Sequence, residues 1–178
     1  MNSFLAESTR SRINHYWELL YVLVERNLKT RYRGSLLGIY WSLLNPLIMT
    51  ALYAAIFGKE FSRYYDNSLL NYILAAFTGL ASFHFFTGAS SQALTSIVAN
   101  GALINKISLP VGLFPVSIIA ANTFQFALGT FPLLAIVTLI RSQDLSNVVA
   151  LIAVTLSLVV LSTGFAAILS SLYVFFGI

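Results

Sequence analysis

Four cations lie close together near the start of the chain, directly before a long run without any charged residue. This cluster consists of Arg26, Lys29, Arg31 and Arg33, and the next charged residue is Lys59. Guanidinium groups bind phosphate oxygens through paired hydrogen bonds. Cations beside an apolar run also mark the cytoplasmic edge of a membrane span. The cluster therefore has two interpretations: contact with a phosphate-bearing ligand, or anchoring to anionic lipid at about 1 kcal/mol per cation.

Groups for other chemistry are scarce. The chain has no cysteine, which excludes disulfides, thiolate metal sites and thiol catalysis. It also has no GxxxxGK[ST] loop to hold ATP phosphates. His84 is an ionisable residue within an apolar run, and such residues suggest function, but it has no carboxylate partner in any span. We interpret His84 as a neutral side chain bonded to a neighbour, with substrate contact and a proton relay as alternatives.

The composition is that of a membrane protein. Of the 178 residues, 58% are hydrophobic and 9% are charged, whereas soluble domains carry roughly 25% charged residues. The mean hydropathy is +0.82. The net charge of +4 comes mostly from the first 33 residues, a pattern typical of membrane topology and lipid contact rather than of nucleic-acid binding. The composition predicts an all-α integral membrane protein.

The cationic cluster belongs to an amphipathic helix that we predict over residues 13–33, after a disordered start at residues 1–12. The charged face of this helix carries His15, Glu18, Glu25, Lys29 and Arg33, and the apolar face carries Ile13, Trp17, Leu20, Val24 and Leu28. Glu25 and Lys29 are spaced to form an i,i+4 ion pair. Such a helix lies in the membrane interface and does not cross the bilayer.

Four membrane spans follow the interfacial helix. Each has at least the roughly 20 residues that a span needs, and we predict them at about 35–57, 69–93, 110–140 and 148–176. With the N-terminus inside, six N-terminal cations and Lys106 lie on the cytoplasmic side, against Lys59, Arg63 and Arg141 outside. This bias places both termini in the cytoplasm. We see a single domain over residues 1–178.

The segment that contains the cluster, ERNLKTRYRGSLLGIYWSLLNP, resembles a family signature. The ABC type-2 permeases that export polysaccharide or polyol phosphate (O-antigen, capsule or teichoic acid) open their first span with R-x-L-K-x-R-Y-R-x-S-x-L-G-x-x-W-x-x-L-x-P. Here that pattern is carried by Arg26, Leu28, Lys29, Arg31, Tyr32, Arg33, Ser35, Leu37, Gly38, Trp41, Leu44 and Pro46. A second stretch, LINKISLPVGLFP, resembles the family's L-I-x-K-x-x-x-P-x-x-x-x-P.

The resemblance implies roles for two segments. The turn between spans two and three would be the coupling helix that contacts the ATPase, and its candidate residues are Asn100, Leu103, Ile104 and Lys106. The alternative is a plain turn with a cytoplasmic lysine. The helix over 13–33 would be the gate helix, in which Lys29, Arg31 and Arg33 contact the head group of a lipid-linked glycan, with lipid anchoring as the alternative.

Aromatic side chains are a third candidate group. Because rings stack on sugar faces, we consider Tyr40, Trp41, Tyr53 and Phe57 as residues that line an export channel. The alternative is an interfacial aromatic belt or ordinary packing.

By this resemblance the chain is a permease subunit of an ATP-driven exporter in the bacterial inner membrane, and not an enzyme. It would bind no cofactor, because ATP and magnesium would lie on a separate ATPase subunit, and it would pair with a second permease copy. The family usually has six spans, so we expect this chain to be its N-terminal two thirds, incomplete at the C-terminus. The alternatives are a drug or small-lipid exporter and a four-span scaffold or remnant without transport.

Overall fold

The computed structural model describes residues 2–33, 38–104, 110–142 and 144–176, and in these ranges it contains helices and turns but no strand. The helices are α1 (Asn2–Tyr32), α2 (Trp41–Phe61), α3 (Leu69–Ala99), α4 (Gly101–Ile104), α5 (Leu113–Gly129), α6 (Phe131–Ser142) and α7 (Leu145–Phe176), with short 3-10 helices at Gly38–Tyr40 and Ser62–Tyr64. This result confirms the prediction of an all-α membrane fold.

Among the described residues, three helical segments are long and apolar enough to cross a membrane: Trp41–Tyr64, α3 and α7. The predicted third span, 110–140, is not one straight helix. It is divided into α5 and α6, which meet at an angle of 43°, and it makes a fourth span if the bent pair is counted as one. Pro132 explains the break, because a proline inside a helix has no N–H to donate and its ring collides with the preceding turn.

A second proline is accommodated by a contact across the molecule. Pro46 lies inside α2 and is buried, and it has no N–H to offer the carbonyl group of Ser42 one turn earlier. The hydroxyl of Thr130, at the α5–α6 break, donates to that carbonyl at 3.4 Å. Thr130 is only 1% exposed. This hydrogen bond therefore links the proline site in α2 to the break between α5 and α6.

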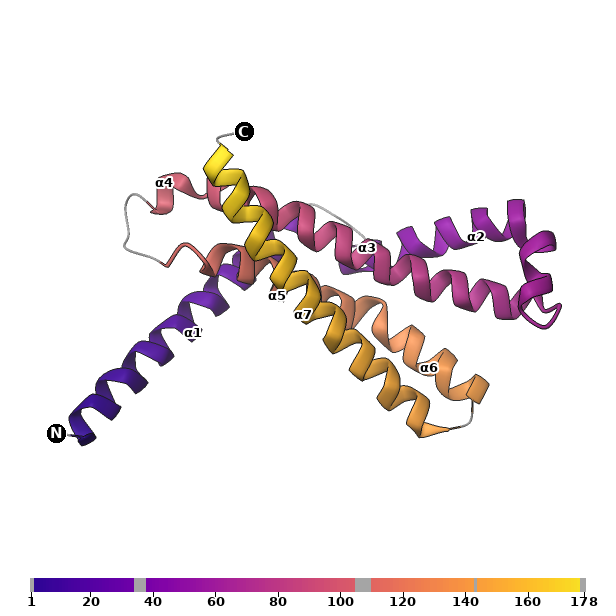
Figure 1. The fold of residues 1–178 in the computed structure, drawn as a ribbon, viewed down its shortest axis with the longest axis horizontal. Coiled ribbons are helices and arrows are strands. Elements are labelled where there is room, and N and C mark those ends of the chain that lie inside the picture. The colour runs from indigo at the N-terminus through magenta and orange to yellow at the C-terminus, as the bar shows by residue number, and fades with distance from the viewer. Residues whose placement is uncertain (1, 34–37, 105–109, 143, 177–178) are drawn as a thin grey trace.

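The N-terminal segment differs from the sequence expectation. Helix α1 begins at Asn2, so residues 2–12 are helical and the prediction of a disordered start is wrong for them. The reason is local: the chain has neither proline nor glycine before Gly34, so nothing interrupts a helix that extends backwards from residue 13. The first half of α1 projects away from the other helices (Figure 1).

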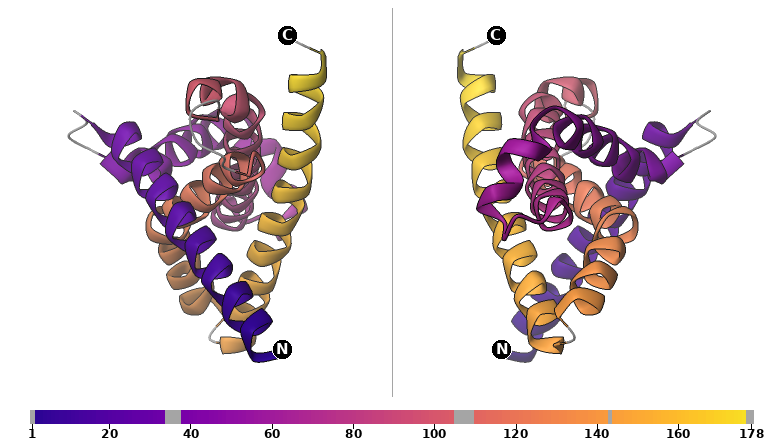
Figure 2. Two further views of the ribbon diagram at one scale, coloured as in Figure 1. Left: turned by 90° about the vertical axis from the view of Figure 1, so that its left-hand side faces the viewer. Right: turned by 90° about the vertical axis from the view of Figure 1, so that its right-hand side faces the viewer.

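Helix α3 lies at the centre of the molecule, in contact with α2, α5 and α7, while α1 packs against α5. Figure 2 shows α7 along one side of this group and α1 along another. The turns that join α2 to α3 and α6 to α7 lie at one end of the molecule (Figure 1). The start of α1, helix α4 and the end of α7 lie toward the other end (Figure 1). This arrangement is the one expected when both turns emerge on the same side of a bilayer.

Small side chains let α7 approach α3 closely. On α7, Ser162, Ala166 and Ser170 recur every fourth residue and are at most 1% exposed. Ala89 and Ala93 of α3 are fully buried and belong to one core cluster with Ala166. Such small-residue rows bring helix backbones together in membranes, where dispersion contacts replace the hydrophobic effect.

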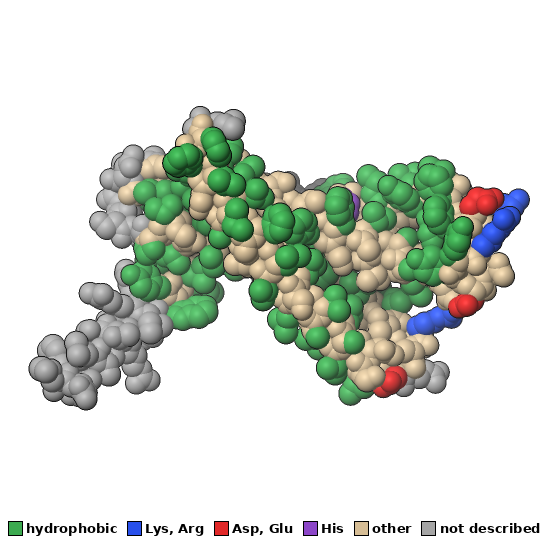
Figure 3. All heavy atoms as spheres, viewed as in Figure 1, with side chains coloured by type: hydrophobic (Ala, Val, Ile, Leu, Met, Phe, Trp, Pro, Cys, Tyr) green, Lys and Arg blue, Asp and Glu red, His purple; other side chains and the backbone are tan. Residues whose placement is uncertain are grey.

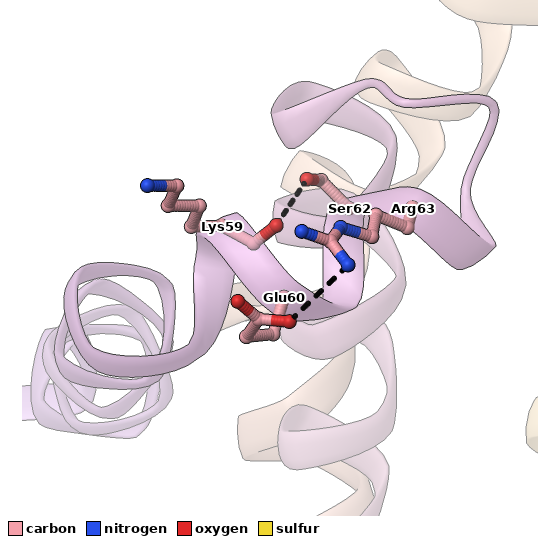
Figure 4. Close-up of polar contacts among 4 residues, drawn as sticks. All are labelled: Lys59, Glu60, Ser62 and Arg63. Atoms are coloured by element: carbon pink, nitrogen blue, oxygen red, sulfur yellow. Dashed lines mark hydrogen bonds and ion pairs between the residues drawn. The ribbon is translucent and has the colours of Figure 1, made fainter.

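The outer surface is apolar along most of its length, and charges gather at the end that carries the α2–α3 turn (Figure 3). There Arg63 forms an ion pair with Glu60 at 3.7 Å, and the Ser62 hydroxyl donates to the Lys59 carbonyl at 3.2 Å (Figure 4). Val160 of α7, by contrast, is 72% exposed. An apolar waist with charged ends matches a bilayer rather than water.

Candidate functional site

The inner face of α1 carries polar residues among its apolar ones. Leu23, Asn27 and Arg31 follow one another at intervals of four, so they share one side of the helix. Leu23 is 6% exposed and Arg31 is partly buried. This side lies against α5, and it differs from the predicted charged face, which was drawn through Lys29 and Arg33.

Arg31 is bonded to side-chain amides from two other helices. Its guanidinium donates to Asn122 Oδ1 of α5 at 3.1 Å and also to Gln125 Oε1 of the same helix. A further bond reaches Gln92 Oε1 of α3. Since hydrogen bonds to an ionised group are stronger than those between neutral groups, these contacts hold α1 firmly to α3 and α5.

The acceptor amides are oriented by their own helices. The Asn122 NH2 group donates to the Ile118 carbonyl one turn back at 2.9 Å, which leaves its oxygen for Arg31. Asn100 follows the same pattern: its NH2 group donates to the Ser96 carbonyl at 2.7 Å, and its oxygen accepts from Arg26. Each amide is therefore fixed at one end before it meets a guanidinium of α1.

Asn27 makes a third polar contact of α1, between those of Arg26 and Arg31. Asn27 Nδ2 donates to the Ser117 hydroxyl of α5 at 3.1 Å, and that hydroxyl donates to the Phe114 carbonyl at 2.8 Å. Together, the bonds from Arg26, Asn27 and Arg31 form what we call the α1 contact row. The row connects the N-terminal helix to α5, to α3 and to the turn at which α3 ends.

A cavity of about 250 Å³ lies beside Arg31, between α2, α3 and α5. Its polar lining includes the amides that bind Arg31, together with Asn45, His84 and Thr130. Aromatic rings form the rest of the wall: Trp41 is half exposed, whereas Phe85 and Phe126 are buried and pack together with ring centroids 5.3 Å apart. The site thus combines amides, one cation and aromatic surface.

The three predicted head-group cations occupy different environments. Only Arg31 enters the protein, while Lys29 and Arg33 are exposed. Lys29 forms the predicted ion pair with Glu25 at 2.6 Å, and the hydrogen bond to Glu25 raises the pKa of the Lys29 amine above its ordinary value. Lys29 and Arg33 therefore remain accessible to an anionic surface, and Arg31 holds helices together.

The predicted coupling segment lies at the end of α3 and in α4. Helix α3 ends at Ala99, α4 begins at Gly101, and the Asn100 carbonyl between them accepts from the Leu103 N–H at 2.9 Å. Leu103 and Ile104 are partly exposed. Lys106 lies outside the described residues. The helix therefore breaks at Asn100 and Gly101.

The four candidate channel aromatics do not gather at one place. Trp41 lines the cavity, and Tyr40 is 65% exposed. Tyr53 and Phe57 lie further along α2 and start a series of ring contacts that continues through Phe61 toward the α2–α3 turn. Of the four, Trp41 is the one that joins the polar site.

The amides that bind Arg31 are not among the predicted site residues. Gln92, Asn122 and Gln125 carry no ionisable group, which is the usual indication of function inside an apolar run. A signal was present: burying an amide without a hydrogen bond is costly, so each such residue in a span requires a polar partner. The i,i+3 spacing of Asn122 and Gln125 also places them on one face of α5.

These features define a class: a helical protein that crosses the membrane several times, with its N-terminal helix bonded to a polar intramembrane site. A family model described as "ABC-2 type transporter" matches residues 18–177. The chain therefore belongs to the ABC-2 type transporter family.

Individual relatives narrow the comparison. The chain is 30% identical over 166 residues to the "O-antigen export system permease protein RfbA" of Klebsiella pneumoniae, covering 92% of this chain and 62% of that protein. It is 30% identical over 128 residues to the RfbA protein of Myxococcus xanthus, covering 72% and 47%. It is also 30% identical over 96 residues to the "Capsule polysaccharide export inner-membrane protein CtrC" of Neisseria meningitidis serogroup B, covering 50% and 36%. The chain thus spans less than two thirds of each relative.

Proposed function

We propose that this chain is the permease part of an ATP-driven exporter that moves a lipid-linked polysaccharide or polyol phosphate outward across the bacterial inner membrane. The observation that carries this proposal is the likeness to permeases named for O-antigen and capsule polysaccharide export, which extends over 92% of the chain for the first of them. The intramembrane site of amides and aromatic rings supports it, since polar groups inside a span are a feature of substrate pathways.

The mechanism is mechanical, because the chain has no phosphate-binding loop for ATP. ATP and magnesium bind to a separate ATPase subunit, which contacts the predicted coupling residues Asn100, Leu103, Ile104 and Lys106. A second copy of the permease supplies the other wall of the export path. Closure of the ATPase subunits moves the turn, and the permease helices open a path between the two copies.

The α1 contact row gives this movement a route to the N-terminal helix. Asn100 belongs to the proposed coupling turn and accepts a hydrogen bond from Arg26 of α1. A displacement of the turn therefore acts on α1 as well as on α3. Lys29 and Arg33, both exposed on α1, then meet the phosphate of the lipid-linked substrate at the cytoplasmic face.

Deletion of the gene tests the proposal. We expect the cells to lose their surface glycan and to accumulate lipid-linked precursor, and a plasmid copy of the full-length gene to restore the surface glycan. Unchanged surface glycan with increased sensitivity to toxic compounds would instead indicate a drug or small-lipid exporter. Unchanged glycan and unchanged sensitivity would point to a scaffold without transport.

A further inference from the structure

We propose that the cavity between α2, α3 and α5 is a binding subsite for a single uncharged sugar ring of the exported glycan. This inference rests on the proposed export function and adds to it a location and a ligand chemistry. It is carried by the amides, the aromatic rings, the size and the charge of the cavity.

The amides offer the hydrogen-bonding groups that sugar hydroxyls require. A hydroxyl both donates and accepts, and a side-chain amide presents two N–H donors and a carbonyl acceptor. The Gln92 oxygen accepts from Arg31, and its Nε2 atom lies 3.8 Å from the position of a Cβ placed on Gly88. Gly88 and Gln92 both line the cavity. The NH2 group of Gln92 is therefore placed at the cavity wall as a donor.

The aromatic rings offer the apolar half of the same recognition. The faces of a pyranose ring present C–H groups, which are attracted to the negative face of an aromatic ring. Trp41 is 52% exposed and lines the cavity, so part of its surface is available for stacking. Phe85 and Phe126 are each 7% exposed and form a buried part of the cavity wall.

The volume fits one ring rather than a chain of sugars. Sites for drug-sized ligands enclose roughly 300–1,000 Å³, and this cavity encloses about 250 Å³. The subsite would therefore hold one sugar residue of the glycan at a time.

The charge favours an uncharged ring. The lining residues include one permanent cation, Arg31, and neither Asp nor Glu. The guanidinium of Arg31 is already bonded to three amide oxygens, so its role is to hold those amides in place. A phosphate would have to displace these amides from the guanidinium, whereas a hydroxyl-bearing ring can bind beside them.

The experiment uses Trp41 as the reporter. The chain has two tryptophans, Trp17 and Trp41, so Trp17→Phe in the purified full-length permease in lipid nanodiscs leaves Trp41 as the tryptophan of this segment. Any tryptophan of the full-length permease outside residues 1–178 is also replaced. We titrate this variant with methyl β-glucopyranoside, with methyl N-acetyl-β-glucosaminide and, separately, with inorganic pyrophosphate. We expect at least one glycoside to change the Trp41 emission to saturation and pyrophosphate to leave it unchanged.

Two leucine substitutions on α3 provide a matched pair. Gly88→Leu adds a side chain at the cavity wall, where the Cβ itself has room and lies beside Gln92 Nε2. We expect it to block one hydrogen bond to the sugar and to raise the half-saturating glycoside concentration by about tenfold or more. Gly79→Leu adds the same side chain where no atom lies within 4 Å and outside this cavity, so its titration should match that of the parent. Gly88→Ala repeats the test with a smaller change that favours helix formation.

Three outcomes overturn the subsite. They are a response to pyrophosphate alone, the absence of any saturable response to glycosides, and an equal loss of binding in the Gly88 and Gly79 variants. The glycan assay of the deletion strain separates these failures from failure of the export function. Restored surface glycan together with no sugar response would reject the subsite and leave the exporter proposal in place.

Discussion

Arg31 illustrates how a partly buried cation is accommodated at the edge of a membrane span. Its bonds go to amide oxygens on two helices. Hydrogen bonds that involve a charged group contribute about 1.5–3 kcal/mol each, and the planar guanidinium can serve several acceptors at once, which a lysine ammonium on a flexible stem does less well. The residue therefore acts mainly as a connector between helices.

We predict that Arg31→Ala loosens α1 from α3 and α5 without preventing membrane insertion. The native segment lacks cysteine, so Asn27→Cys with Ser117→Cys, whose native side chains are 3.1 Å apart, gives a pair that a short bifunctional thiol reagent can link. Crosslinking should be efficient in this background, in which any cysteine beyond the segment has been removed, and fall severalfold when Arg31→Ala is added.

Lys29→Ala is the control for this measurement, because Lys29 is exposed and its ion pair with Glu25 lies within α1. Exposed pairs contribute little to stability, so crosslinking should be retained. Equal crosslinking with and without Arg31 would show that apolar packing around Leu23 is sufficient to hold α1.

Local spacing predicted some residue-level contacts and not others. The Glu25–Lys29 pair follows from its i,i+4 spacing and is confirmed. The partners of Arg31 lie 61, 91 and 94 residues away. Helix periodicity says nothing about such distances, and the prediction for Arg31 was contact with a lipid-linked head group rather than with amides of other helices.

At the level of helices, the α3–α7 interface depends on small side chains. We predict that Ala166→Leu destabilises the protein by about 1–3 kcal/mol, because added methyl groups in a tightly packed interface force side chains and backbones apart. Thermal unfolding in detergent, followed by circular dichroism, should show a lower midpoint. Ala167→Leu is the matched control, since Ala167 is exposed on the same helix. Equal midpoints for both variants would contradict close packing at Ala166.

A second helix-level prediction concerns the bond between α1 and the α3–α4 turn. If Arg26 and Asn100 transmit movement through their contact, Arg26→Ala and Asn100→Ala should each lower ATP-driven export in reconstituted vesicles, and the double variant should be hardly worse than the single ones. Residues in direct contact are expected to show such non-additivity. Independent, additive losses would mean that each residue acts through other contacts.

The sequence predicted where most helices lie but not how the third span is built. Hydropathy placed an apolar run over 110–140, and one run was read as one helix. The structure divides it at Thr130. Whether a proline such as Pro132 bends or breaks a helix depends on its tertiary surroundings. At the break, the Thr130 hydroxyl donates to the Ser42 carbonyl, which lies 88 residues away in the sequence, and helix periodicity cannot predict such a contact.

At the level of the whole molecule, the prediction concerns orientation. The cation bias places the α2–α3 turn outside the cell and the α3–α4 turn inside. In intact spheroplasts a membrane-impermeant maleimide should label Tyr64→Cys, whose native side chain is 82% exposed. Gly101→Cys should be labelled only after permeabilisation. The reverse pattern would place the N-terminus outside and would contradict contact between the α3–α4 turn and an ATPase in the cytoplasm.

The global arrangement was only partly accessible from the sequence. The number of apolar runs and the positions of the polar turns were predictable, because a bilayer imposes a length and a polarity on each segment. The central position of α3 was not, since its contacts with α2, α5 and α7 depend on the shapes of side chains such as Ala89 and Ala93.

The lengths of α3 and α7 have a consequence for the surrounding lipid. With 31 and 32 residues and a rise of about 1.5 Å per residue, the two helices are about 46–48 Å long, whereas the hydrocarbon layer is about 30 Å thick. Tilt absorbs only part of this hydrophobic mismatch, so the ends of α3 extend into the head-group layer. A thicker bilayer would then draw Asn100 toward the head groups, and a thinner bilayer would expose it further to water. Membrane thickness itself would regulate how far the α3–α4 turn reaches into the cytoplasm.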